Sequence, residues 1–131
     1  MVIIKVFLSY RWEDKRYADG LKGAFLNPTN EYRHIPFNER EDYRQKGETV
    51  IKNYLKGIIG NCDALICLIG NMTHNSPWID YELDVATSQN KKIVAVRIKG
   101  TNGGAPNLIR SRGIKIIEYD SRKINDALSK K

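Results

Sequence analysis

Apolar residues along the chain follow two patterns, short continuous runs typical of buried strands and a spacing of three to four residues typical of helices. Residues 2–9 form a β-branched apolar run and predict a buried strand. The acidic pair Glu13 and Asp14 follows and can cap or charge a first helical turn. The next apolar residues share one helical face, before residues 27–30 end the helix: Tyr17, Leu21, Ala24 and Phe25.

The middle of the chain repeats this alternation of strand and helix. Residues 33–37 predict a short strand, and Pro36 favours an edge position in the sheet. Residues 38–47 are polar without a period, so we expect an exposed loop of about ten residues, longer than most connections. Helical spacing returns over residues 50–58. Residues 63–70 are apolar on both faces, which predicts a central strand.

A further helix begins at Ser76 and Pro77, because serine is a favoured N-cap and proline suits the first helical position. Its buried stripe consists of Ile79, Leu83 and Ala86. The remaining pattern predicts a strand at 92–98, a flexible loop at 101–106, a short helix with Leu108 and Ile109, a strand at 114–119 and a last helix capped by Ser121.

Strands that alternate with helices predict a parallel sheet covered on both faces. We expect one α/β domain over residues 1–131, a flavodoxin-like three-layer sandwich with five parallel strands in the order 2-1-3-4-5. Ligands of such sheets bind beyond the carboxyl ends of the strands, at the switch point between the first and third strands. Residues 9–12 and 70–78 follow those two strands and should line one crevice.

Composition narrows the class of protein further. A chain of 131 residues that is 41% hydrophobic and 28% charged suits one folded domain with one core. No apolar run approaches the roughly 20 residues of a membrane span, so we expect a cytoplasmic protein without a membrane partner. Two cysteines and two histidines show no zinc-ligand spacing, which argues against a structural metal: Cys62, Cys67, His34 and His74.

The net charge of +7 is distributed unevenly along the chain. Residues 91–131 hold eleven basic and three acidic residues, whereas residues 1–90 hold eleven and twelve. A basic segment can attract a polyanion, but these residues are scattered and lack the interleaved aromatics of a stacking platform. A solvated basic face is therefore favoured, and nucleic acid is the least favoured partner.

Several known kinds of site are excluded at the predicted switch point. The chain has no G-x-G-x-x-G fingerprint and no P-loop. The third predicted strand ends in Leu68, Ile69 and Gly70, where a receiver domain would place its acceptor aspartate. The first strand ends in Ser9, Tyr10 and Arg11, a poor match to the hydroxyl-rich phosphate loop of a flavodoxin.

Glu82 is the remaining candidate, four residues after Trp78 and therefore on the same helix face. Ile79 and Leu83 belong to the core face, which turns the edge with Trp78 and Glu82 toward the crevice. A carboxylate beside an aromatic can hold ribose hydroxyls and stabilise an oxocarbenium ion, the demands of glycosidic cleavage. Spacing alone nevertheless favours the alternative, a solvated glutamate on a helix surface.

Four segments resemble the conserved boxes of TIR and TIR-like domains. Residues 6–11, Val-Phe-Leu-Ser-Tyr-Arg, resemble the first-strand box, and residues 47–59 resemble the second helix. Residues 62–69 resemble the third strand, and residues 76–83, Ser-Pro-Trp-Ile-Asp-Tyr-Glu-Leu, resemble the third-helix box. The most similar branch is the compact prokaryotic TIR-like proteins, including those of Thoeris anti-phage systems. Many TIR domains have cysteine after the box tryptophan, where this chain has Ile79.

The resemblance implies cleavage of the bond between nicotinamide and ribose in NAD⁺, with ADP-ribose or a cyclic isomer as product and second messenger. It implies that Glu82 is catalytic and that four residues bind the substrate: Ser9, Tyr10, Arg11 and Trp78. It also implies that NAD⁺ is a substrate and not a cofactor, and that no metal takes part. Self-association, through the access loop at residues 38–47, and a downstream effector protein are the expected partners.

Three further residues are weaker candidates for the same site, namely Ser76, His74 and Asn38. For three of the candidate residues the sequence leaves two roles open. Arg11 can clamp a phosphate or serve as a surface charge, Tyr10 can stack on a base or pack at the strand end, and a loop histidine such as His74 is more often idle.

Two other functions fit the same pattern of residues. A TIR-like adaptor would keep the fold and act through protein contacts without turnover. A nucleoside deoxyribosyltransferase would use the glutamate as a covalent nucleophile on a nucleoside. Whether water or an adenine nitrogen attacks the ribose carbon, and hence which product forms, depends on the shape of the pocket.

Overall fold

The computed structural model describes residues 4–25, 33–35 and 47–130, and the account below concerns these residues. The strands are β1 (Lys5–Ser9), β2 (Arg33–Ile35), β3 (Ala64–Ile69), β4 (Lys92–Arg97) and β5 (Ile116–Glu118). The helices are α1 (Lys15–Phe25), α2 (Glu48–Gly60), α3 (Pro77–Ser88), α4 (Asn107–Ser111) and α5 (Ser121–Ser129). Two short 3₁₀ turns, η1 (Trp12–Asp14) and η3 (Thr73–Asn75), follow β1 and β3.

The strands form one sheet in the order β2-β1-β3-β4-β5, and every neighbouring pair is parallel. The expected α/β architecture with a parallel sheet and helices is therefore confirmed. β3 is buried along its whole length, as its continuous apolar run predicts for a central strand. In the register between β1 and β3, Ser9 lies opposite Cys67.

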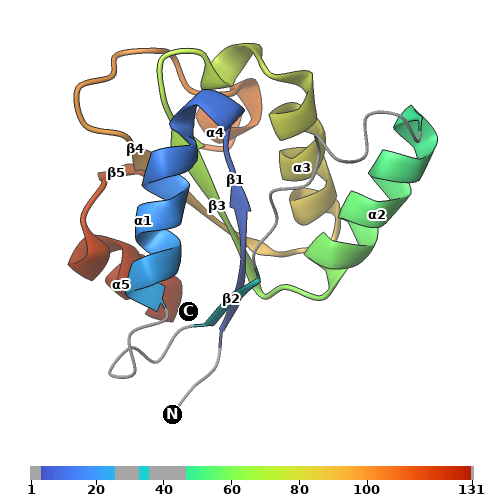
Figure 1. Ribbon diagram of the computed structural model, residues 1–131, viewed down its shortest axis with the longest axis horizontal. Helices are drawn as coiled ribbons and strands as arrows, with labels where there is room; N and C mark the ends of the chain where they lie inside the picture. The colour runs from blue at the N-terminus through green and yellow to red at the C-terminus, as the bar shows by residue number, and fades with distance from the viewer. Residues whose placement is uncertain (1–3, 26–32, 36–46, 131) are drawn as a thin grey trace.

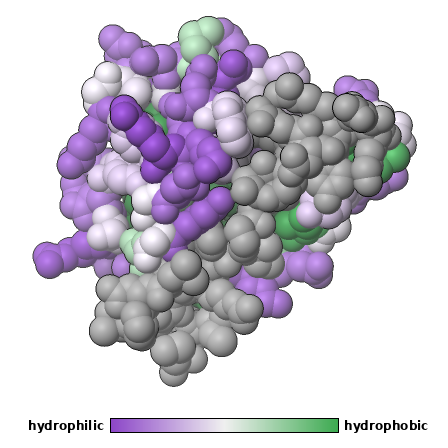
Figure 2. Space-filling model, in the orientation of Figure 1, coloured by the Kyte–Doolittle hydropathy of each residue, from purple (hydrophilic) through white to green (hydrophobic). Residues whose placement is uncertain are grey.

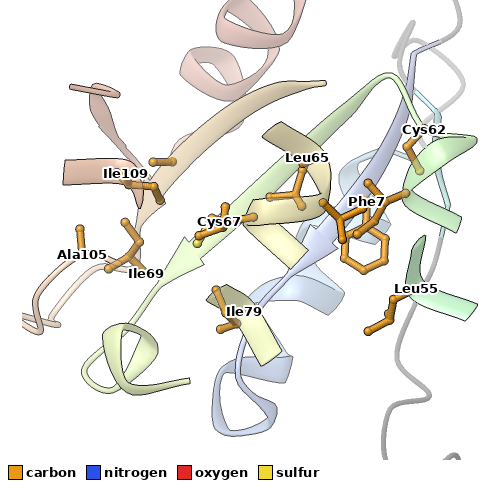
Figure 3. Close-up of a cluster of buried hydrophobic side chains, with 14 of the residues drawn as sticks. Phe7, Leu55, Cys62, Leu65, Cys67, Ile69, Ile79, Ala105 and Ile109 are labelled. Atoms are coloured by element: carbon orange, nitrogen blue, oxygen red, sulfur yellow. The ribbon is translucent and has the colours of Figure 1, made fainter. Parts of the chain in front are cut away.

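Helices cover both faces of this sheet (Figure 1). Successive side chains of a strand point to opposite faces, so Phe7 joins the core beneath α2, α3 and α4, while Leu8 joins the core beneath α1 and α5. Figure 3 shows the first core, where Leu65, Cys67 and Ile69 of β3 lie on the side of Ile79 from α3.

Helix caps follow the expected chemistry with one correction. Ser76 caps α3 by accepting a hydrogen bond from the Ile79 N–H at 3.2 Å, as predicted. Asp120, and not Ser121, caps α5, because its carboxylate accepts from the N–H groups of Arg122 and Lys123. The neighbouring Ser121 is the first residue of the helix.

Two other expectations differ from the structure. β5 begins at Ile116 and not at residue 114, because the Ile114 N–H donates to Ile109 O and closes the turn after α4. The segment 101–106 was expected to be flexible. In the structure it forms hydrogen bonds with Ile69, Asn71 and Arg97. These contacts shape one end of the sheet and are described with the site.

The surface of the described part is mainly hydrophilic. Figure 2 shows only small hydrophobic spots among hydrophilic side chains on the face in view. The large hydrophobic side chains that are exposed within the described ranges are Trp12, Val50, Tyr54 and Met72. No helix in these ranges is long and apolar enough to cross a membrane.

Candidate functional site

A buried hydrogen bond joins the first strand to the third long helix. The Oγ of Ser9 donates to Oε1 of Glu82 at 2.8 Å, across 73 positions of sequence. Ser9 is fully buried, and Glu82 is only 1% exposed. The alternative of a solvated glutamate on a helix surface is therefore wrong, and the structure brings together two of the expected site residues.

The local sequence explains how each partner arrives there. Ser9 is the last residue of β1 and shares the strand face of Phe7, which is the face that α3 covers. Capping by Ser76 and the proline at position 77 fix where α3 begins. Glu82 is itself buried and bonds Ser9 of β1, so its side chain faces the sheet.

The surroundings of Glu82 have a low polarity. Cys67, opposite Ser9 in the sheet, is fully buried, and its thiol pKa is raised far above the usual range. Burial is the main cause, and the nearby Glu82 carboxylate adds to it. Burial likewise raises the pKa of the Cys62 thiol to about 11. Both thiols are therefore protonated and unreactive at neutral pH.

Trp78 and Arg11 lie beside the pair on their own elements. Trp78, one turn before Glu82, is half-buried against the core and meets the Tyr81 ring edge-on, with ring centroids 6.3 Å apart. Arg11, just after β1, pairs with Glu13 at 2.8 Å and keeps 34% of its side chain exposed. Contact of either side chain with a substrate stays a prediction.

Tyr10 packs on the other face of the sheet from Ser9. Its side chain is 3% exposed and packs in the core beneath α1 and α5, together with Leu8. Because neighbouring strand residues point to opposite faces, Tyr10 faces away from Ser9 and Glu82. Tyr10 therefore packs at the strand end, which is one of its two expected alternatives, and contact of Tyr10 with a substrate stays a prediction.

The three weaker candidates separate into different positions. Ser76 is buried and serves as the N-cap of α3. His74 is exposed on η3, with Gly104 beside its ring. Asn38 and the expected access loop up to residue 46 lie outside the described residues, so their roles stay predictions.

A second carboxyl group lies at the switch point, and the sequence patterns did not identify it. Asp14, at the end of η1, is 8% exposed, and its carboxylate packs against Gly70, which directly follows β3. A side chain at position 70 would overlap both carboxylate oxygens. Burial, aided by Glu13 and partly opposed by Arg11, raises the pKa of Asp14. Sequence alone suggested only a helix-start carboxylate.

The loop after β4 is clamped onto the loop after β3. Asn71 Oδ1 accepts from the Asn102 N–H at 3.0 Å, and the Arg97 guanidinium donates to Gly103 O at 2.6 Å. Gly103 lies so close to the Asn71 backbone that a Cβ would overlap it. The glycine pair at 103–104 was the only available signal for this close approach.

The arrangement limits the chemistry that the site can perform. The described residues contain no group of three or more histidines, cysteines, aspartates or glutamates close enough to hold a metal ion. The buried carboxylate of Glu82, with one oxygen fixed by a serine hydroxyl, can hold hydroxyl donors and stabilise a developing positive charge. Asp14 adds a second buried acceptor at the same end of the sheet.

The fold of the chain is similar to that of a solved TIR domain. It matches the crystal structure of the TIR domain of the Toll-related receptor TRR-2 from Hydra magnipapillata with a TM-score of 0.61 and 13% identity. The match covers 94% of this chain and 90% of the receptor domain, and at this identity it establishes the fold alone.

Sequence comparison gives the family. The model of the TIR-like domain of Thoeris protein ThsB matches residues 7–103, and the chain belongs to this family. A relative from Bacillus cereus (strain MSX-D12), named "Putative cyclic ADP-D-ribose synthase ThsB1", is 27% identical over 79 residues. That match covers 60% of this chain and 41% of the relative, so the chain spans less than half of the relative's length.

Proposed function

We propose that this TIR-like domain cleaves the N-glycosidic bond between nicotinamide and ribose in NAD⁺, with Glu82 as the catalytic carboxylate. The observation that carries the proposal is the buried hydrogen bond from Ser9 Oγ to Glu82 Oε1 at the end of β1. The name of the Bacillus cereus relative, "Putative cyclic ADP-D-ribose synthase ThsB1", supports the same chemistry.

The electrostatics of Glu82 suit this reaction. Departure of nicotinamide leaves an oxocarbenium ion on the ribose, and a carboxylate in a low-polarity site stabilises such a charge more strongly than one in water. The leaving group is already cationic, so no acid is needed to protonate it. The hydrogen bond from Ser9 holds one carboxylate oxygen in place before the substrate binds.

The burial of Glu82 also bears on the rate. At 1% exposure the carboxylate is covered, so a nucleotide reaches it only when the groups over it move. We therefore expect slow basal turnover that self-association or a trigger increases, and a product that signals to an effector protein in anti-phage defence within the cytoplasm. Trp78 is proposed to contact the nicotinamide riboside half, and Arg11 to bind phosphate.

The test is NAD⁺ consumption by the purified chain at high concentration, with products separated by chromatography. We expect loss of NAD⁺ with the wild type and none with Glu82→Gln, which keeps the size of the side chain. The product peak distinguishes ADP-ribose from a cyclic isomer. Absence of turnover in concentrated or clustered protein would contradict the proposal and favour an adaptor. Turnover of deoxynucleosides with NAD⁺ intact would instead favour a deoxyribosyltransferase.

A further inference from the structure

The short turn η1 presents two side chains that the Ser9–Glu82 pair does not use. Trp12, its first residue, is 52% exposed, and Asp14, its last, is 8% exposed. Asp14 touches Gly70, so η1 lies against the end of β3 at the switch point of the sheet. This is the position where open α/β sheets bind their ligands.

Among the described residues, the carboxylate of Asp14 has no hydrogen-bonding partner. Within the described part of the chain, no hydrogen bond or ion pair reaches either oxygen, and Oδ2 is sealed from solvent. A buried carboxylate without a donor is costly, and such groups in native proteins call for an explanation, which is often a functional one. A donor that arrives with a ligand would satisfy it.

Trp12 provides an apolar surface beside this acceptor. The Nζ of Lys15 lies 5.5 Å from the centre of its ring, and about half of the side chain remains open to solvent. Met72, also exposed, comes two residues after Gly70, just as Trp12 comes two residues before Asp14. The contact between Asp14 and Gly70 therefore brings both apolar side chains to the same end of the sheet. Aromatic rings and thioethers are favourable surfaces for a flat base.

The η1 group lies across the end of the sheet from Glu82. Ser9 points to the face that α3 covers, whereas η1 leads into α1 on the opposite face. A dinucleotide has two nucleoside halves, and a substrate whose nicotinamide ribose meets Glu82 must place its other half elsewhere. An acceptor on the same short turn as an exposed aromatic ring matches a nucleoside, which offers a flat base together with O–H and N–H donors.

We propose that η1 forms a second nucleoside subsite that binds the adenosine half of the dinucleotide. The base stacks on Trp12, and a hydroxyl or amino group of the adenosine donates to the Asp14 carboxylate. Gly70 leaves room for that carboxylate, since any side chain there would displace it. The assignment of the adenosine half rests on the proposed function, whereas binding at η1 can be measured without turnover.

The experiment uses two mononucleotides with one phosphate each, AMP and nicotinamide mononucleotide. The chain has two tryptophans, so Trp78→Phe leaves Trp12 as the only tryptophan fluorophore. We expect AMP to change its emission and nicotinamide mononucleotide to leave it unchanged. In the otherwise native chain, Trp12→Ala and Asp14→Asn should each weaken AMP binding at least fivefold, and Trp12→Phe should retain it. The exposed Val50→Ala is the matched control and should bind AMP normally.

Unchanged Trp12 emission with AMP, or native AMP affinity in both Trp12→Ala and Asp14→Asn, would overturn the subsite. Equal weakening of both mononucleotides would also overturn it, because that result indicates a structural role. The proposed function has a separate outcome. AMP binding through Trp12 without any NAD⁺ cleavage would support the subsite and contradict the proposed enzymatic function. Glu82-dependent cleavage that does not depend on Trp12 would support the enzymatic function and contradict the subsite.

Discussion

At the scale of single residues, a serine hydroxyl and a carboxylate meet in a buried position where neither interacts with bulk water. The bond from Ser9 to Glu82 has a carboxyl acceptor, and a hydrogen bond to a carboxylate contributes about 1.5–3 kcal/mol. The same bond orients the carboxylate. Removing the hydroxyl therefore affects the placement of charge more than the packing of the strand.

Ser9→Ala should lower the rate of NAD⁺ cleavage about 10- to 100-fold, since each factor of ten corresponds to about 1.4 kcal/mol. The measurement is kcat with saturating NAD⁺, together with circular dichroism to show that the fold persists. Ser111→Ala is a matched control, because this exposed serine bonds only its own helix and should keep native activity. A native rate in Ser9→Ala would show that Glu82 needs no such orientation.

Asp14 allows a prediction about stability and pH. Its pKa is raised in the fold by burial, so the folded chain holds this proton more strongly than the unfolded chain. Stability therefore decreases as pH rises from the usual aspartate range through the raised value, and the full penalty is present at neutral pH. Asp14→Asn removes the charge and should stabilise the chain at pH 7 by about 1 kcal/mol.

Chemical denaturation of both proteins between pH 3 and pH 7 tests this sign. The advantage of Asp14→Asn should shrink toward acid pH, where the wild-type carboxyl becomes protonated. A variant that is less stable than the wild type at pH 7 would contradict the prediction. Greater stability combined with weaker AMP binding is the pattern of a residue kept for function at a cost in stability.

At the scale of elements, the site depends on where α3 begins and on what holds the loop before it. Ser76 caps the helix, and the Thr73 hydroxyl accepts from the Gly70 N–H at 2.8 Å and donates to Leu68 O. The segment after β4 then packs on Asn71 through Gly103. Bonds within the β3–α3 connection and contacts with the segment after β4 thus fix this connection. Because the connection sets where α3 begins, it also sets the position of Glu82.

Gly103→Ala should destabilise the chain by about 1–3 kcal/mol, because the new methyl group overlaps the Asn71 backbone and must push the two loops apart. The neighbouring Gly104→Ala is a matched control, since its Cβ would meet only His74 at an ordinary 3.8 Å. It should change stability by less than about 0.5 kcal/mol. Thermal unfolding of the two variants gives the comparison, and equal melting temperatures would show that the loops do not pack closely.

At the scale of the whole molecule, the ends of β1 and β3 carry the candidate chemistry, whereas the excess of positive charge belongs to residues 91–131. Part of that charge is engaged locally: Lys92 donates to main-chain oxygens of Leu128 and Lys130, and Lys123 pairs with Glu118 at 3.0 Å. Some of the basic residues thus form hydrogen bonds and an ion pair at the surface around β5 and α5. This accords with a solvated basic face better than with a nucleic-acid platform.

The covered position of Glu82 leads to a prediction for the assembled protein. If self-association moves the groups over the carboxylate, NAD⁺ turnover per molecule should increase several-fold as the chain is concentrated or crowded. The measurement is specific activity against protein concentration, with light scattering on the same samples. Constant specific activity over a range in which the chain associates would show that assembly does not control access.

Much of the element pattern could be predicted from the sequence, because the burial of a helix stripe or a strand depends on periodicity within a few residues. The continuous apolar run over residues 63–70 marked the central strand, and Ser76 with Pro77 marked the start of α3. Element ends were less predictable. β5 begins late because the Ile114 N–H bonds back to Ile109 O, and Asp120 caps α5 in place of Ser121. Both features depend on contacts of the folded backbone.

By itself, then, the sequence determined the order of strands and helices, the four boxes that resemble TIR domains, and Glu82 as the candidate carboxylate. Only the tertiary structure decided that Ser9 bonds Glu82, that Tyr10 turns to the opposite face, and that Asp14 lies buried against Gly70. Periodicity is a local property of the chain. The meeting of residues from separate elements depends instead on strand register and on how closely loops approach, which no single segment encodes.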